Sequence, residues 1–132
     1  MSVVSLVSAK NGLSVNHEQS AQSEWIDICG LDDLVAYSGV SALVGETQIA
    51  IFYIPGAEPA LYALDNWCPA AKANVLSRGI VGDVNGEFVV ASPLYKEHFS
   101  LITGHCVEKP LQVSVWGIRL MGNRVQVSSG AK

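Results

Sequence analysis

Residues 62–70 read Tyr-Ala-Leu-Asp-Asn-Trp-Cys-Pro-Ala, and residues 90–104 read Val-Ala-Ser-Pro-Leu-Tyr-Lys-Glu-His-Phe-Ser-Leu-Ile-Thr-Gly. In each segment a small polar side chain, Cys68 or Ser92, is followed directly by a proline. Proline restricts the backbone and so lowers the entropy that is lost when a loop becomes ordered. We therefore expect two loops of defined shape, held by packing and hydrogen bonds.

These segments resemble the two cluster-binding loops of Rieske proteins, approximately Ala-Leu-Asp-Asn-x-Cys-Pro-His and Val-x-Cys-Pro-x-His-Gly-x-x-Phe-x-Leu-x-Thr-Gly. A Rieske [2Fe–2S] centre takes two cysteine thiolates on one iron and two histidines on the other. Here Cys68 is retained, Ser92 replaces the second cysteine, and Ala70 and Tyr95 replace the histidines. Alanine has no donor atom, and a serine hydroxyl is a poor ligand for an iron–sulfur cluster. The resemblance therefore implies a Rieske-like scaffold without its cluster. We expect the hydroxyls of Ser92 and Tyr95 to form hydrogen bonds across the gap.

The spacing of turn residues independently predicts an all-β domain. Short apolar runs recur about every 8–12 residues between Gly and Asn turns, which is typical of a β-sandwich or small barrel. The strongest hairpin pattern is Asn85-Gly86, and a single helical turn is expected at 31–34. Alternation predicts that Ile118, Leu120, Val125 and Val127 point inward. The expected strands are 41–44, 48–54, 61–64, 80–84, 87–91, 98–102, 113–115, 118–121 and 124–127.

Composition and charge limit the possible functions. Of the 132 residues, 49% are hydrophobic and 15% charged, which favours one folded domain. We assign it to 23–129, after a flexible extension at 1–22 that contains a short strand near 3–7. The net charge of −4 argues against nucleic-acid binding. No apolar run approaches the ~20 residues of a membrane span. Three cysteines, an odd number without close pairs, indicate a reducing compartment, and we expect the cytoplasm.

A second resemblance is closer, to the small subunit of assimilatory NAD(P)H-dependent nitrite reductase. It covers roughly residues 24–128, and its most specific string is Ala-Ser-Pro-Leu-Tyr-Lys at 91–96. The resemblance implies a large-subunit partner that carries FAD, an iron–sulfur cluster and sirohaem and reduces nitrite to ammonium. This chain would hold no cofactor and no catalytic residue. A Rieske-like module for a different oxidoreductase, or an electron-transfer Rieske ferredoxin, are the alternatives, and the missing ligands disfavour the second.

The loop tips are the candidate docking surface, since in cluster-bearing relatives they face the redox partner. Tyrosine is common in interface hot spots. The candidate residues are Trp67, Lys72, Arg78, Tyr95, Lys96 and His98. The competing interpretation is an ordinary solvated loop. We expect Trp67 to be exposed, and Trp25 and Trp116 to lie in the core.

Two further hypotheses concern cysteine chemistry. A zinc site could draw on Cys29, Cys68, Cys106, His98 and His105, but close ligand pairs are missing. Cys68 and His98 could form a nucleophile–base pair, although no oxyanion element is recognisable. A buried thiol that packs as a small hydrophobe is the more common situation, and we favour it for Cys68.

Overall fold

A computed structural model describes residues 3–4, 25–94 and 96–128, and this part of the chain is built almost entirely of strands. The strands are β1 (Val3–Val4), β2 (Ile26–Gly30), β3 (Ser38–Val44), β4 (Thr47–Tyr53), β5 (Leu61–Asp65), β6 (Trp67–Cys68), β7 (Ala73–Asn74), β8 (Ile80–Val84), β9 (Glu87–Ala91), β10 (His98–Ser100), β11 (Val115–Met121) and β12 (Arg124–Ser128). Two short 3-10 helices, η3 (Leu31–Asp33) and η4 (Leu76–Arg78), interrupt them. The predicted all-β class is confirmed.

Seven strands form one strongly curved sheet, in the order β1-β3-β4-β5-β11-β12-β2. We call this sheet the barrel. Its interior is lined by side chains from alternate positions, such as Ile49 and Ile51 on β4 and Val125 and Val127 on β12, which are fully buried. This alternation follows from the two-residue period of a strand, and it confirms the inward orientation predicted for β12.

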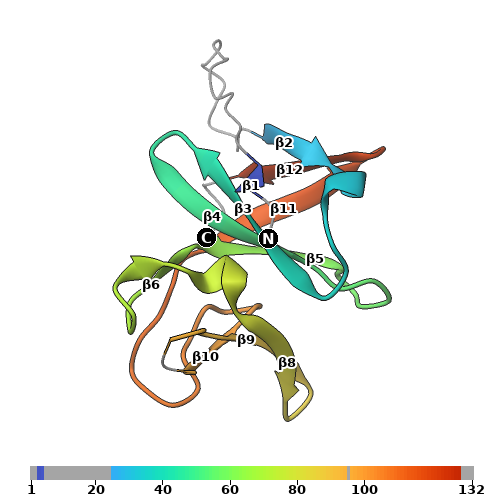
Figure 1. The fold of residues 1–132 in the computed structure, drawn as a ribbon. Helices are drawn as coiled ribbons and strands as arrows, with labels where there is room; N and C mark the ends of the chain where they lie inside the picture. The colour runs from blue at the N-terminus through green and yellow to red at the C-terminus, as the bar shows by residue number, and fades with distance from the viewer. Residues whose placement is uncertain (1–2, 5–24, 95, 129–132) are drawn as a thin grey trace.

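The remaining elements form a second region, which we call the tip region, at 66–94 and 96–111. It is inserted between β5 and β11 and contains the sheet β10-β9-β8 and the pair β6-β7. Figure 1 shows these elements below the barrel. A separate core joins them to the outer face of the barrel, where Phe52 of β4 packs with Leu76, Val90 and Phe99. Strand β4 is therefore buried on both faces, which explains its unbroken apolar run.

Several strand boundaries differ from the sequence prediction. The strands at 80–84 and 87–91 are confirmed. The residues at 118–121 belong to β11 together with Val115, whereas Val113 and Ser114 of the strand expected at 113–115 lie before β11 begins. The strand expected at 98–102 ends at Ser100, because its hydroxyl accepts hydrogen bonds from the amides of Ile102 and Thr103 and so forms a turn. The helical turn at 31–34 is present as η3.

Two burial predictions were wrong. Trp25 is exposed rather than part of the core, and it is covered on one face by the Arg119 guanidinium, 4.3 Å from the ring centroid. Leu120 is also exposed, although it is paired with the buried Val125, since this part of β11 has β12 on one side and β5 pairs only with Val115 and Trp116. Trp116 is half-buried and donates its indole N–H to Asp65 at 2.8 Å.

The N-terminal prediction is only partly covered by the structure. Val3 and Val4 form β1, which pairs in parallel with Ser41 and Ala42 of β3. The rest of the strand expected at 3–7, and most of the extension at 1–22, lie outside the described residues. In the described part of the chain, the helices are too short to cross a membrane.

Candidate functional site

The two loops that correspond to the Rieske ligand loops are closed by equivalent backbone hydrogen bonds. In the first loop the amide of Lys72 donates to the carbonyl of Cys68 at 2.6 Å, and in the second the amide of Lys96 donates to the carbonyl of Ser92 at 2.9 Å. Each hydrogen bond closes a five-residue turn that has proline at its second position. The two segments quoted at the outset therefore form a matched pair of loops.

Both loops place a lysine in the left-handed backbone region. The φ angle is 57° at Lys72 and 64° at Lys96. This region is unfavourable for residues with a Cβ atom, by about 1–2 kcal/mol relative to the right-handed region, and glycine usually occupies it. Glycine stands at the Lys96 position in the Rieske pattern given above. Both loops thus retain a long cationic side chain where glycine would relieve strain.

The loops touch each other through Cys68 and Ser92. The Cys68 thiol donates to the Ser92 hydroxyl at a distance of 3.5 Å, and the amide of Ala71 donates to the Cys68 sulfur at 3.4 Å. Both side chains are buried. The expected contact of Ser92 across the gap is confirmed, whereas Tyr95 lies outside the described residues.

The four ligand positions do not fit a [2Fe–2S] cluster. The half-buried Ala70 packs against the apolar core and has no donor atom. Ser92 supplies a hydroxyl, which directly contacts the one remaining thiol, and position 95 carries a phenol instead of an imidazole. A Rieske two-iron centre needs two thiolates and two imidazoles, and other [2Fe–2S] clusters need four thiolates. The donor set of these loops cannot supply them.

The hypotheses of a zinc site and of a cysteine nucleophile find no support in the geometry. All three cysteines are buried and free, and burial raises the pKa of the Cys29 thiol to about 11. The sulfur of Cys68 contacts Ser92 and Ala71, whereas the ring of His98 contacts Glu108. Within the described ranges, no three His, Cys, Asp or Glu side chains converge as metal ligands. A buried thiol that packs as a small hydrophobe describes Cys68 best.

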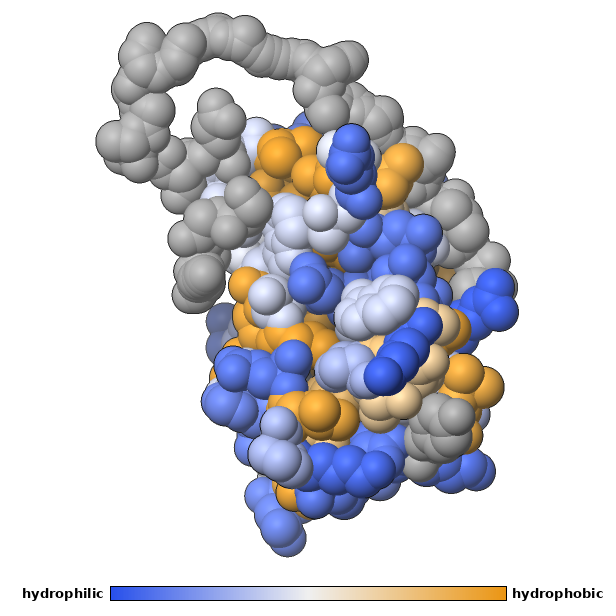
Figure 2. Space-filling model, turned by 90° about the vertical axis from the view of Figure 1, so that its left-hand side faces the viewer, coloured by the Kyte–Doolittle hydropathy of each residue, from blue (hydrophilic) through white to orange (hydrophobic). Residues whose placement is uncertain are grey.

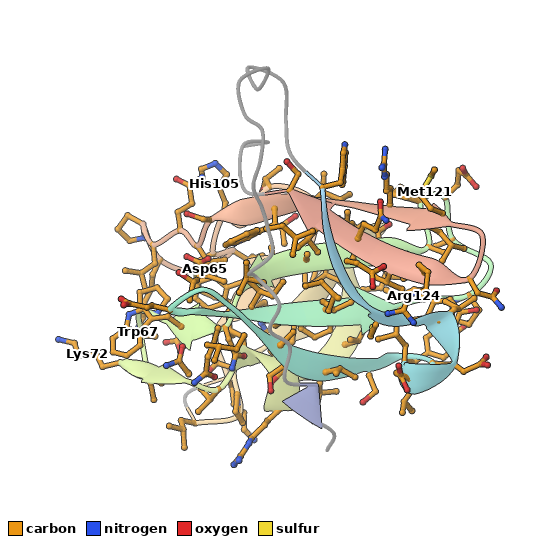
Figure 3. All side chains as sticks on the ribbon, turned by 90° about the horizontal axis from the view of Figure 1, so that it is seen from above. Asp65, Trp67, Lys72, His105, Met121 and Arg124 are labelled. Carbon is orange, nitrogen blue, oxygen red and sulfur yellow. The ribbon has the colours of Figure 1, made fainter. Side chains whose placement is uncertain are left out.

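The docking candidates have different surroundings. The side chain of Trp67 is 48% exposed, and Lys72, Arg78 and Lys96 are exposed as well. Figure 3 shows Trp67 and Lys72 projecting outward at one edge, far from Arg124 and Met121. Figure 2 shows the face that carries β6, where hydrophilic groups alternate with small apolar areas.

Arg78 and His98 are less directly part of this edge. Arg78 ends η4, which packs on β3 instead of belonging to a loop tip. His98 lies on β10 and is half-buried, with its Nδ1 only 2.6 Å from a carboxylate oxygen of Glu108. Trp67, Lys72 and Lys96 are therefore the most accessible described candidates.

Sequence reasoning missed two carboxylate contacts that support the second loop. The buried carboxylate of Glu97 lies 2.7 Å from the Lys109 ammonium, which raises the pKa of Lys109. The Glu108 carboxylate accepts a hydrogen bond from the amide of His98 at 2.9 Å, and this bond, with the adjacent ring, lowers the pKa of Glu108. No short sequence motif predicts such contacts, because the two partners lie in different segments of the chain.

Asn66 is a second structural residue that the sequence did not reveal. Its side-chain oxygen accepts from the amide of Ser77 at 2.7 Å, and its amide group donates to Gln48 at 3.1 Å. Its backbone also bonds Gln48 and Leu76. Because Asn66 is buried at the start of the first loop, it fixes that loop to both β4 and η4.

Comparison with known proteins agrees with this geometry. Residues 24–128 match the model of the Rieske-like [2Fe-2S] domain family. The nitrite reductase (NADH) small subunit of Escherichia coli K12 is 44% identical over 86 residues, which are 65% of this chain and 79% of that protein. The chain belongs to the Rieske-like family of nitrite reductase small subunits. Within this family, a crystal structure from Mycobacterium tuberculosis, described as an NADH-dependent nitrite reductase small subunit, is 34% identical. It has a TM-score of 0.77, and the match covers 84% of this chain and 99% of that one.

A relative of the small-subunit family also occurs inside a longer polypeptide. The protein of Klebsiella oxytoca named nitrite reductase [NAD(P)H] large subunit is 41% identical over 106 residues. The match spans 80% of this chain but only 11% of the Klebsiella protein. In that organism a domain like this one is thus covalently joined to the rest of a nitrite reductase chain.

Proposed function

We propose that this chain is the non-redox small subunit of an NAD(P)H-dependent nitrite reductase, which docks on the large subunit and supports it. The observation that carries the proposal is the contact between Cys68 and Ser92 at the former ligand positions, 3.5 Å apart. These loops lack the donors for a cluster, and yet a buried hydrogen bond joins them and a backbone hydrogen bond closes each one. An ordered tip without redox chemistry is suited to binding a protein partner.

The relatives support the choice of partner. A segment like this chain is part of the Klebsiella large subunit, so such a domain works beside the remaining domains of that protein. In the proposed complex, FAD, an iron–sulfur cluster and sirohaem belong to the large subunit, which reduces nitrite to ammonium for nitrate assimilation. This chain contributes no cofactor. Its three free, buried thiols favour a reducing compartment, and we propose the cytoplasm.

The docking surface we propose is centred on Trp67, Lys72 and Lys96, and Arg78, Tyr95 and His98 are the further candidates that the sequence suggests. An exposed tryptophan beside cations is a common composition for interface hot spots. The free subunit leaves Trp67 48% exposed. Burial of this ring against the large subunit would supply apolar contact area, and the lysines would orient the complex.

Reconstitution tests the proposal. The large subunit is expressed alone and together with this chain, and nitrite-dependent oxidation of NADH and of NADPH is followed. We expect activity to appear or to rise strongly only when both proteins are present. Met121→Ala, at the opposite end of the molecule, is the control and should leave this effect unchanged (Figure 3).

Two outcomes would contradict the proposal. Failure of the two proteins to co-purify, combined with unchanged activity, would remove the nitrite reductase assignment. A purified small subunit with visible absorption and bound iron would instead favour an electron-transfer ferredoxin.

A further inference from the structure

We propose that Lys72 and Lys96 act as a matched pair of cationic contacts that bind carboxylates on an acidic surface of the nitrite reductase large subunit. This inference rests on the proposed docking function and specifies the chemistry of the partner. It is carried by two independent observations, the backbone strain at both lysines and the absence of an ion pair at either lysine among the described residues.

The first observation is that strain recurs at equivalent positions. Both lysines close their loop by donating the backbone amide to the residue four positions earlier, and both have φ near 60°. Glycine would make the same hydrogen bond without the unfavourable contacts of Cβ. Strain that persists at a site is a reason to look for a function of the side chain. Here the side chains share a positive charge and an exposed position.

The second observation concerns charge. In the part of the chain that the structure describes, Lys109 pairs with Glu97, Arg124 pairs with Asp27, and Arg119 bonds Gln126 and covers Trp25. Among the described residues, no ion pair joins Lys72, Lys96 or the exposed Arg78 of η4 to a carboxylate. Glu97 and Glu108, the acidic residues of the second loop and its neighbour, already contact Lys109 and His98. The two loops therefore expose cations without a neighbouring carboxylate among the described residues, although the chain as a whole has a net charge of −4.

Exposed apolar side chains flank the two cations. Trp67 is 48% exposed in the first loop and Leu94 is 57% exposed in the second. Each loop thus offers a lysine and a neighbouring apolar group. A partner surface with two carboxylates beside apolar pockets would complement this pattern, and the charges would steer its approach.

Three pairs of substitutions separate charge from backbone strain. Lys72→Asn with Lys96→Asn removes the charges but keeps a residue that tolerates left-handed φ. Lys72→Arg with Lys96→Arg keeps the charges. Lys72→Gly with Lys96→Gly removes the charges and the strain together. Asn85→Gly, in the β8–β9 turn at a φ of 55°, is the backbone control without a change of charge.

Affinity for the purified large subunit is measured at low and at high salt, and the melting temperature of each variant is measured alone. We expect the Asn pair to weaken binding about fivefold to tenfold at low salt and to reduce the salt dependence. The Arg pair should bind as the wild type does. The Gly pair should melt at a higher temperature and yet bind more weakly, whereas Asn85→Gly should leave binding unchanged.

The result that overturns the inference is a Gly or Asn pair that binds as tightly as the wild type with the same salt dependence. In that case, wild-type binding to the large subunit preserves the proposed function and removes only the role of the lysines. Absence of binding by the wild-type chain removes both. Weaker binding that does not depend on salt would also contradict a contact with carboxylates.

Discussion

The barrel and the tip region of this chain are stabilised in different ways. In the barrel, β3 and β4 pair over their full seven-residue lengths, and the interior is filled by side chains such as Ile49 and Val125, which are not exposed at all. In the tip region, β6 and β7 pair over two residues, and the loops depend on individual polar contacts. Those contacts are made by Asn66, by Cys68 with Ser92, by Glu97 with Lys109 and by Glu108 with His98.

The difference indicates how a Rieske-like scaffold keeps its loops ordered without a metal. A bound cluster links two loops and adds its binding free energy to folding. Here that link is divided among a thiol–hydroxyl contact, the Lys109–Glu97 ion pair, the hydrogen bonds between His98 and Glu108, and a buried amide. Each is weak, since a single net hydrogen bond contributes about 0.5–1.5 kcal/mol. Substitution of a single polar residue should therefore lower the local stability of the tip region while leaving that of the barrel unchanged.

The largest effect is expected from a backbone contact where the tip region meets the barrel. Gly104 has a φ of 80°, and a Cβ atom there would lie 2.1 Å from the carbonyl oxygen of Val113. Gly104→Ala should therefore destabilise the protein by about 4 kcal/mol or more, or prevent folding. Gly45→Ala is the matched control, because its φ is 63° and its Cβ meets nothing within 4 Å. Thermal unfolding of both variants tests this, and equal losses would contradict it.

The next effect concerns Asn66, which connects the two regions. Asn66→Ala leaves the buried amide of Ser77 without its acceptor, and an unsatisfied buried group costs about 1–3 kcal/mol. Gln48→Ala keeps the acceptor for Ser77 and removes only the exposed side-chain partner of the Asn66 amide group, so it should cost less. Urea unfolding measures both. A larger loss in Gln48→Ala than in Asn66→Ala would show that the bond to Gln48 dominates.

Removal of the Ser92 hydroxyl should affect the tip region alone. Ser92→Ala is expected to lower stability by about 1 kcal/mol and to increase local opening around Cys68. The rate at which a thiol reagent labels Cys68 should then rise, while Cys29 in the barrel serves as the internal control. Both thiols are buried, and labelling of each should remain slow without denaturant. A parallel rise at both cysteines would show that the two regions unfold together.

The smallest effect is expected from Glu108. Hydrogen bonding to His98 holds the pKa of this carboxyl below its ordinary value of 4.5. Since the folded pKa is the lower one, the contribution to stability is present above pH 4.5 and is lost as the pH falls through the folded value. Because the carboxylate is partly exposed, Glu108→Gln should cost less than about 1 kcal/mol at pH 7. The difference from wild type should shrink at acid pH, and a difference independent of pH would contradict this assignment.

The fold could be read from the sequence wherever the pattern was local. The Asn85-Gly86 turn correctly predicted the first and last residues of both strands of the β8–β9 hairpin. Alternation of apolar residues correctly predicted which side chains of β12 point into the core. Local sequence patterns did not predict burial correctly where the packing of distant segments determines whether a side chain is exposed. Leu120 alternates correctly but lies on the part of β11 that no longer pairs with β5. Trp25 is an aromatic residue whose ring is covered by a cation instead of by the core.

The candidate site divides in the same way. The identities of Cys68, Ala70, Ser92 and Tyr95 by themselves excluded a Rieske cluster, since the donor atoms of a side chain are a property of the residue alone. Only the tertiary structure decided that Cys68 and Ser92 meet although 24 residues separate them in the chain, and that Lys72 and Lys96 take equivalent strained conformations. Contacts and backbone angles of this kind depend on how distant segments are brought together, which no single stretch of sequence specifies.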